Sequence, residues 1–130
     1  MASREKGDTT AINSYRDLIV WKAALRLAVD CYSATKAFPN SEAYGMTSQI
    51  RRSAASIAAN VAEGHGRENT GAFIRFLRVA QGSLKELETH LILCGEVGLM
   101  VEAKVASLLG QTDEIGKMLR SMIRSLQQKS

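Results

Sequence analysis

The stretch TGAFIRFLRVAQGSLKELETHLILCGEVG, residues 70–98, decides the fold that this 130-residue sequence predicts. Its apolar residues recur in alternating steps of four and three, which places them along one side of an α-helix. They are Phe73, Leu77, Ala80, Leu84, Leu87, Leu91 and Cys94. Thr70 is suited to cap such a helix and Gly98 to end it, so we expect one long amphipathic helix between them.

Three more segments repeat this period, two before residues 70–98 and one after. We expect helices at about 17–37, 46–63 and 102–127, with Pro39 stopping the first and Gly64 the second. The apolar lines of these helices are Leu18, Trp21, Leu25, Ala28, Tyr32 and Thr35; Ile50, Ala54, Ile57 and Val61; and Val101, Val105, Leu108, Thr112, Ile115, Leu119, Met122 and Leu126.

Four amphipathic helices joined by short loops predict an all-α fold, an antiparallel up-down-up-down four-helix bundle. The composition agrees, because the chain has one proline and only 5% aromatic residues, a balance that favours long helices over sheets. We expect a flexible N-terminal tail at residues 1–14 and a single bundle domain at residues 15–128.

No pattern in the sequence predicts a metal or a cofactor. Cys31 and Cys94 each lie within an apolar helical pattern, where we expect buried thiols, and no CxxC or paired histidine has metal-ligand spacing. The longest apolar run is far short of the roughly 20 residues of a membrane span, and residues 1–14 lack the apolar stretch of a signal peptide. We therefore expect no membrane contact and a cytoplasmic location.

The loop GHGREN, residues 64–69, raises one enzymatic alternative. His65 stands near Glu63 and Glu68 in the sequence, which suggests a weak ribonuclease. Helical-bundle ribonucleases of the HEPN type use an arginine four to six residues before the histidine, a place that Asn60 occupies here. We therefore predict a protein that is not an enzyme and keep the ribonuclease as a minor hypothesis.

Apolar residues outside the four lines suggest contacts between subunits. They are Leu27, Val29, Ile74, Val79, Ile92, Leu93, Leu109, Met118 and Ile123. A second apolar face on several helices favours a homo-oligomer, although a monomer with a wider core would absorb part of it.

A strip of small polar residues follows the second predicted helix at steps of four and three: Gln49, Ser53, Ser56, Asn60 and Glu63. A solvent-facing helix usually carries Lys and Glu, so this strip favours a close helix contact with hydrogen-bonded polar groups. Trp21 is predicted to anchor the core or an interface between subunits, because large aromatic side chains dominate such contacts.

The net charge of +4 is unevenly distributed in the predicted bundle. Alternating helix directions bring the start of the first helix, the end of the second, the start of the third and the end of the fourth to one end. Eight basic residues gather there: Arg16, Lys22, Arg67, Arg75, Arg78, Arg120, Arg124 and Lys129. Three acidic residues accompany them, Asp17, Glu63 and Glu68, whereas charges at the opposite end cancel. This end is a candidate phosphate-binding surface. The alternatives for Arg75 and Arg78 are ion pairs with Glu63 or Glu68 across the loop, or a solvated face without a binding role.

Several uncommon pieces occur in order between residues 15 and 126. They are Asp17-Leu18 with Trp21; Phe38-Pro39 with Glu42, Tyr44 and Gly45; Gln49 with Arg51-Arg52; Ser56; Asn60-Val61-Ala62-Glu63-Gly64; Arg67; and Gly82-Ser83 with Glu86. In these pieces the chain resembles the four-helix bundle family first named for open reading frames in intervening sequences of bacterial 23S rRNA genes. The resemblance implies a ring, a homopentamer, and the polar strip coincides with the family's central motif.

That family is distantly similar to the accessory variability determinant of diversity-generating retroelements, a basic pentamer that binds nucleic acid and a reverse transcriptase. Our first hypothesis is therefore a non-enzymatic, ring-forming protein that binds RNA or other structured nucleic acid through its basic end. The best candidate residues are Arg67, Arg75, Arg78, Arg120 and Arg124. The alternative is an adaptor for an enzyme encoded beside it, such as a reverse transcriptase, with no nucleic-acid binding of its own.

Overall fold

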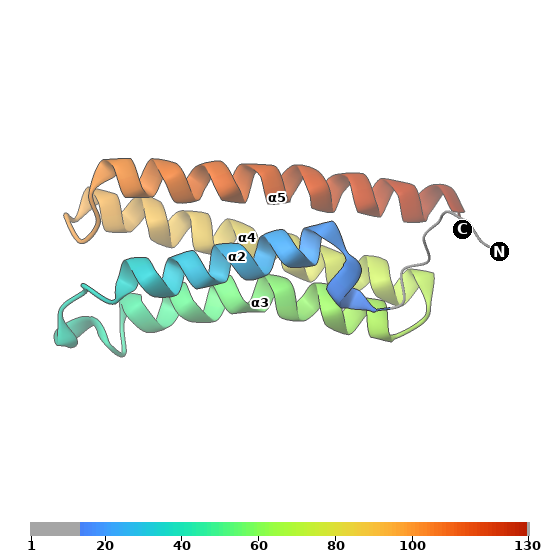
Figure 1. The fold of residues 1–130 in the computed structure, drawn as a ribbon, viewed down its shortest axis with the longest axis horizontal. Helices are drawn as coiled ribbons and strands as arrows, with labels where there is room; N and C mark the ends of the chain where they lie inside the picture. Colours follow the sequence, from blue (N-terminus) through green and yellow to red (C-terminus); the bar gives the residue numbers. More distant parts are fainter. Residues whose placement is uncertain (1–13, 130) are drawn as a thin grey trace.

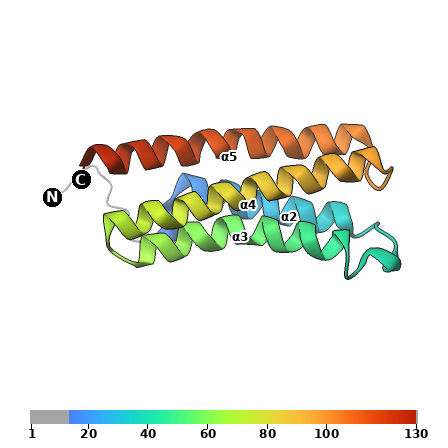
Figure 2. The ribbon, with the colours of Figure 1, turned by 180° about the vertical axis from the view of Figure 1, so that it is seen from behind.

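The computed structural model describes residues 14–129, which form four long α-helices and two short 3-10 helices. The elements are η2 (Tyr15–Asp17), α2 (Ile19–Thr35), η3 (Asn40–Glu42), α3 (Met46–Gly66), α4 (Thr70–Glu96) and α5 (Glu102–Lys129). The four long helices run alternately up and down (Figure 1; Figure 2). The predicted all-α antiparallel bundle is confirmed, and the predicted tail lies almost entirely at residues 1–13, outside the described residues.

The helices form a closed square, in which α2 packs on α3, α3 on α4, α4 on α5 and α5 on α2. The contact between α3 and α4 is the most extensive and that between α2 and α5 the least. The largest fully buried side chains come from all four helices: Leu27, Ile50, Ile57, Leu77, Leu84, Leu87, Leu91, Leu108, Ile115 and Leu119. We call the end where α2 and α4 begin and α3 and α5 finish the terminal end (Figure 1).

The apolar line predicted in residues 70–98 is the core face of α4. Every member of that line is buried except Phe73, which is half-buried. Gly98 follows the helix with a φ of +81°, as expected of a glycine stop. The predicted cap was wrong by one residue, because Asn69, not Thr70, accepts the hydrogen bond from the backbone N–H of Ala72, at 2.8 Å.

The apolar line predicted for the first helix was only partly right. Leu25 and Tyr32 are 44% and 45% exposed, whereas Leu27, predicted to lie outside the line, is fully buried. The helix is rotated so that Val20, Ala24, Leu27 and Cys31 face the core. Leu18, Ala28 and Thr35 of the predicted line are buried beside them, so the face that packs on α3 and α5 lies between the two apolar lines of this helix.

Gly64 does not end the second predicted helix, because α3 continues to Gly66. The left-handed residue in the following loop is Glu68, with a φ of +55°. Gly64 is buried where α3 meets α4, and a Cβ there would lie 2.7 Å from Cβ of Phe76. This glycine therefore permits close helix packing rather than a turn.

Within residues 14–129, no helix is both long and apolar enough to cross a membrane.

Candidate nucleic-acid interface and the polar seam

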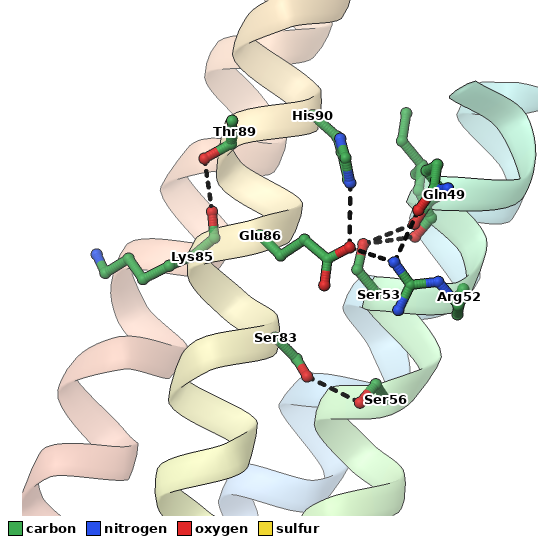
Figure 3. Close-up of polar contacts among 10 residues, drawn as sticks. Gln49, Arg52, Ser53, Ser56, Ser83, Lys85, Glu86, Thr89 and His90 are labelled. Atoms are coloured by element: carbon green, nitrogen blue, oxygen red, sulfur yellow. Dashed lines mark hydrogen bonds and ion pairs between the residues drawn. The ribbon is translucent and has the colours of Figure 1, made fainter. Parts of the chain in front are cut away.

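The polar strip lies along the seam between α3 and α4. Ser53 is fully buried, and its hydroxyl donates to the carbonyl of Gln49 at 2.8 Å. The hydroxyls of Ser56 and Ser83 lie 2.8 Å apart and join the two helices (Figure 3). The Asn60 side-chain amide donates to the carbonyl and hydroxyl of Ser56, at 2.8 and 2.9 Å. Among these hydrogen bonds, only the Ser56–Ser83 contact crosses from α3 to α4, whereas the hydrogen bonds of Ser53 and Asn60 stay within α3.

The seam continues into a charged cluster at half-exposed positions. Arg52 of α3 forms an ion pair with Glu86 of α4 and donates to the side-chain oxygen of Gln49 at 2.7 Å. Nε2 of His90 lies 3.3 Å from the same Glu86 oxygen (Figure 3). The hydrogen bond from Arg52 is the main cause that holds the pKa of Glu86 below its ordinary value of 4.5, and His90 lowers it further. The spacing within each helix gave no sign that Arg52 and Glu86 would meet.

Trp21 is half-buried against the core, not in its centre. Its ring meets that of Tyr15 edge to face, with centroids 5.1 Å apart. On the same helix, Thr35 accepts a 2.9 Å hydrogen bond from Nε of Arg51, whose guanidinium lies over the Tyr32 ring. The contact of Trp21 with Tyr15 thus packs η2 against α2, and the hydrogen bond of Arg51 to Thr35 connects α3 to α2.

Arg67 is the one candidate arginine with partners among the described residues. Its guanidinium pairs with Glu63 at 2.8 Å and lies over the ring of Phe76, 5.1 Å from the ring centroid. Within residues 14–129, neither Arg75 nor Arg78 pairs with Glu63, which Arg67 engages, or with Glu68, so the ion-pair alternative is wrong. The solvated face stays an open alternative.

Arg75, Arg78, Arg120 and Arg124 are exposed, and none makes an ion pair or hydrogen bond with its side chain within residues 14–129. A Cβ at Gly95 would contact Val105 and a Cβ at Gly116 would contact Leu84, which fixes the antiparallel register of α4 and α5. In that register Arg124 lies opposite Phe76, between the levels of Arg75 and Arg78. Nη1 of Arg120 would lie 3.6 Å from the same Cβ at Gly116, so the Arg120 guanidinium lies back along α5 beside that glycine. We call these four residues the arginine face.

His65 and Glu63 are not brought together. The His65 ring packs edge to face on Phe73, with centroids 5.8 Å apart, whereas Glu63 is turned toward Arg67. Two residues apart on a helix, the two side chains point to different sides. Within residues 14–129, the His65 ring forms no ion pair or hydrogen bond with Glu63 or Glu68.

Both cysteines are buried and free, as predicted. Burial is the main cause that raises the pKa of the Cys31 thiol to about 12 and that of Cys94 to about 11, so both stay protonated at neutral pH. Residues 14–129 contain no group of three or more His, Cys, Asp or Glu side chains placed to hold a metal ion.

The fold is an all-α four-helix bundle in which the Ser56–Ser83 hydrogen bond and the Arg52–Glu86 ion pair connect α3 to α4. The model of the 23S rRNA-intervening sequence protein family matches residues 16–121. The chain belongs to that family, as the sequence resemblance predicted. It is similar to a crystal structure of a protein with unknown function from the S23 ribosomal protein family of Bacteroides thetaiotaomicron. The two share 28% sequence identity and a TM-score of 0.73, over 81% of this chain and 98% of that one. No curated protein matches the chain.

Proposed function

We propose that this protein is a ring-forming, non-enzymatic bundle that binds RNA or other structured nucleic acid through the arginine face, with Arg67 at its edge. The observation that carries the proposal is the gathering of four exposed arginines, without partners in residues 14–129, on the α4 and α5 surface near the terminal end. Exposed guanidinium groups without acidic neighbours suit phosphate oxygens, which they bind in a bidentate manner.

The placement of Arg75 supports this use. Arg75 and Arg78 are three residues apart on α4, so two like charges stand one turn apart on the helix surface. The sequence nonetheless places arginines at 75 and 78 and leaves them unpaired in the described part of the chain. Their repulsion costs stability that a bound polyanion would recover.

Exposed apolar side chains support the ring. Leu25, Val29 and Tyr32 of α2 are 44 to 51% exposed and line a groove of about 620 Å³ with Ala55 and Ala58 of α3. On α4, Val79, Ile92 and Leu93 are exposed to a similar degree. A head-to-tail contact between unlike surfaces closes into a ring when the rotation permits. A ring would also present several arginine faces to one polyanion.

The test is a titration of labelled RNA hairpin and DNA duplex at two salt concentrations, with light scattering on the same sample. We expect the logarithm of the affinity to fall linearly with the logarithm of salt, by roughly 0.7 to 0.9 per phosphate contact. The double variant Arg75→Glu with Arg78→Glu should abolish nucleic-acid binding and keep the helical circular-dichroism signal. Lys85→Glu with Lys104→Glu, the same charge change away from the arginine face, is the control. Equal binding by both double variants would overturn the proposal.

The groove between α2 and α3 also supports the adaptor function as a second candidate. An amphipathic helix of a partner enzyme would approach this groove closely, because Ala55 and Ala58 on its α3 side are small. In that case the protein should form a stable complex with an enzyme encoded beside it and shift no RNA by itself. The cytoplasmic location stays a prediction.

A further inference from the structure

A cavity of about 700 Å³ opens at the terminal end between the start of α2 and the last turns of α5. It lies where the least extensive of the four helix contacts leaves room. Leu18 and Val20, which are buried, form part of its lining, together with the His65–Phe73 pair. Its volume is in the range of about 300 to 1,000 Å³ that small-molecule sites occupy.

The wall from α5 combines apolar and polar groups. Met118, Met122 and Leu126 are half-buried along the cavity, and Ser121 and Ser125 stand one turn apart on the same helix. Neither serine hydroxyl has a hydrogen-bond partner within residues 14–129. The ligand that fits is therefore mostly apolar, with hydrogen-bonding groups on one edge.

Two lysines outnumber the one acidic residue, Asp17, in the lining of the cavity. Lys117 and Lys129 both line it, and the contacts of Lys117 to Asp113 and Glu114 are long, at 3.5 and 3.6 Å, and exposed. Lys117, Ser121 and Arg124 follow at steps of four and three, so they share one exposed side of α5. This side joins the cavity to the arginine face.

Resting on the proposed function, we propose that the cavity receives one unstacked base of a bound RNA. The base lies against the methionines and the His65–Phe73 pair, its polar edge meets Ser121 and Ser125, and the flanking phosphates lie on Lys117 and Lys129. Proteins read RNA largely through single-stranded bases that are splayed out and packed on aromatic or other apolar side chains. Thioether groups also contact aromatic rings favourably.

The shape of the cavity favours a base over a lipid chain. Ile19, Ser121 and Ser125 are exposed, so one side of the cavity is open to solvent. An acyl chain is stabilised by enclosure, whereas a flat base attached to a backbone needs an open side through which the strand leaves. The preferred nucleic acid is then a hairpin or bulge, not a continuous duplex.

The experiment compares three RNAs of equal length: a hairpin, the same hairpin with abasic loop positions, and a blunt duplex. We expect the abasic hairpin to bind about 5- to 100-fold more weakly than the intact one, the range produced by losing one stacked base. A hairpin carrying 2-aminopurine in the loop should change its fluorescence on binding. Ser121→Leu, which narrows the cavity, should remove the preference for the intact loop and keep salt-dependent duplex binding. Ser107→Leu, at an exposed serine about four turns earlier on α5, is the matched control.

The outcomes separate the two proposals. Salt-dependent binding of all three RNAs with equal affinity would overturn the base-binding cavity and leave the phosphate-binding proposal standing. Loss of the loop preference in Ser107→Leu as well as in Ser121→Leu would also overturn the cavity. If no RNA binds at all, both proposals fall.

Discussion

At Gly64, α3 and α4 lie so close that a single methyl group has no room. A Cβ there would be 2.7 Å from Cβ of Phe76 and 3.3 Å from the carbonyl oxygen of Phe73, a backbone atom that cannot rotate away. We expect Gly64→Ala to lower the free energy of unfolding by about 1–3 kcal/mol, the cost of overpacking. Chemical denaturation followed by circular dichroism measures it.

Gly66→Ala is the matched control, because it lies in the same last turn of α3 and a Cβ there meets nothing within 4 Å. It should leave stability unchanged or raise it by up to about 1 kcal/mol through helix propensity. Equal destabilisation by both variants would mean that the loop, not the close approach, requires glycine.

Glu86 gives the molecule an acid-dependent contact between α3 and α4. Because Arg52 and His90 lower its pKa below 4.5, ionised Glu86 stabilises the folded state above pH 4.5, and this stabilisation is lost as the pH falls through the lowered pKa. We expect Glu86→Gln to lower the free energy of unfolding at pH 7 by at most about 1 kcal/mol for so exposed a pair, which thermal unfolding shows as a lower midpoint temperature. The difference from the wild type should disappear in strong acid.

Glu88→Gln controls for the lost charge, since Glu88 bonds to Lys85 within α4 only. A difference between wild type and Glu86→Gln that stays constant down to strong acid would contradict the role given to the ionised carboxylate.

At the scale of the element, α4 depends on its N-cap. The Asn69 side chain accepts from the N–H of Ala72, which otherwise lacks a partner at the helix start. Asn69→Ala should lower the free energy of unfolding by about 1 kcal/mol, whereas Asn69→Asp, which keeps an accepting oxygen, should retain most of that stability. Thr70→Ala, just inside the exposed first turn, should change the free energy of unfolding little. Denaturant midpoints of the three variants measure this order, and a larger loss in Thr70→Ala would contradict it.

The helices differ in how far the sequence could predict them. The core face of α4 was predictable because its apolar residues follow one unbroken line, whereas Ile74, Val79, Ile92 and Leu93 beside it form no continuous line. On α2, Leu25 and Tyr32 extend the line begun by Leu18, while Leu27 and Cys31 form another beside it, and no local property chooses between them. Only the arrangement of the neighbouring helices does, and that is a tertiary effect.

The candidate site divides in the same way. The gathering of Arg75, Arg78, Arg120 and Arg124 near one end follows from alternating helix directions alone, so it was predictable. The engagement of Arg67 with Phe76, and of Arg52 with Glu86, depends on which faces of α3 and α4 meet and was missed.

At the scale of the whole molecule, the bundle exposes apolar side chains that are not part of its core. Val29 is 51% exposed in the groove of α2 and α3, so a charge there would disturb a subunit contact at this groove with little cost to the core. We expect Val29→Glu to convert the proposed ring into particles of one 14.1 kDa chain while keeping the helical signal. Light scattering coupled to gel filtration measures the mass.

Ala106→Glu, an exposed position on α5 outside that groove, should leave the mass unchanged.

If Val29→Glu also weakens RNA binding although it lies away from the arginine face, the binding depends on several arginine faces acting together, because linked weak sites gain affinity without new contacts. If the mass falls and the affinity does not, each subunit binds nucleic acid alone. If the wild type itself has the mass of one chain, the ring is overturned. A larger mass that stays unchanged in both variants would place the subunit contact elsewhere, with the exposed Val79, Ile92 and Leu93 of α4 as the next surface to charge.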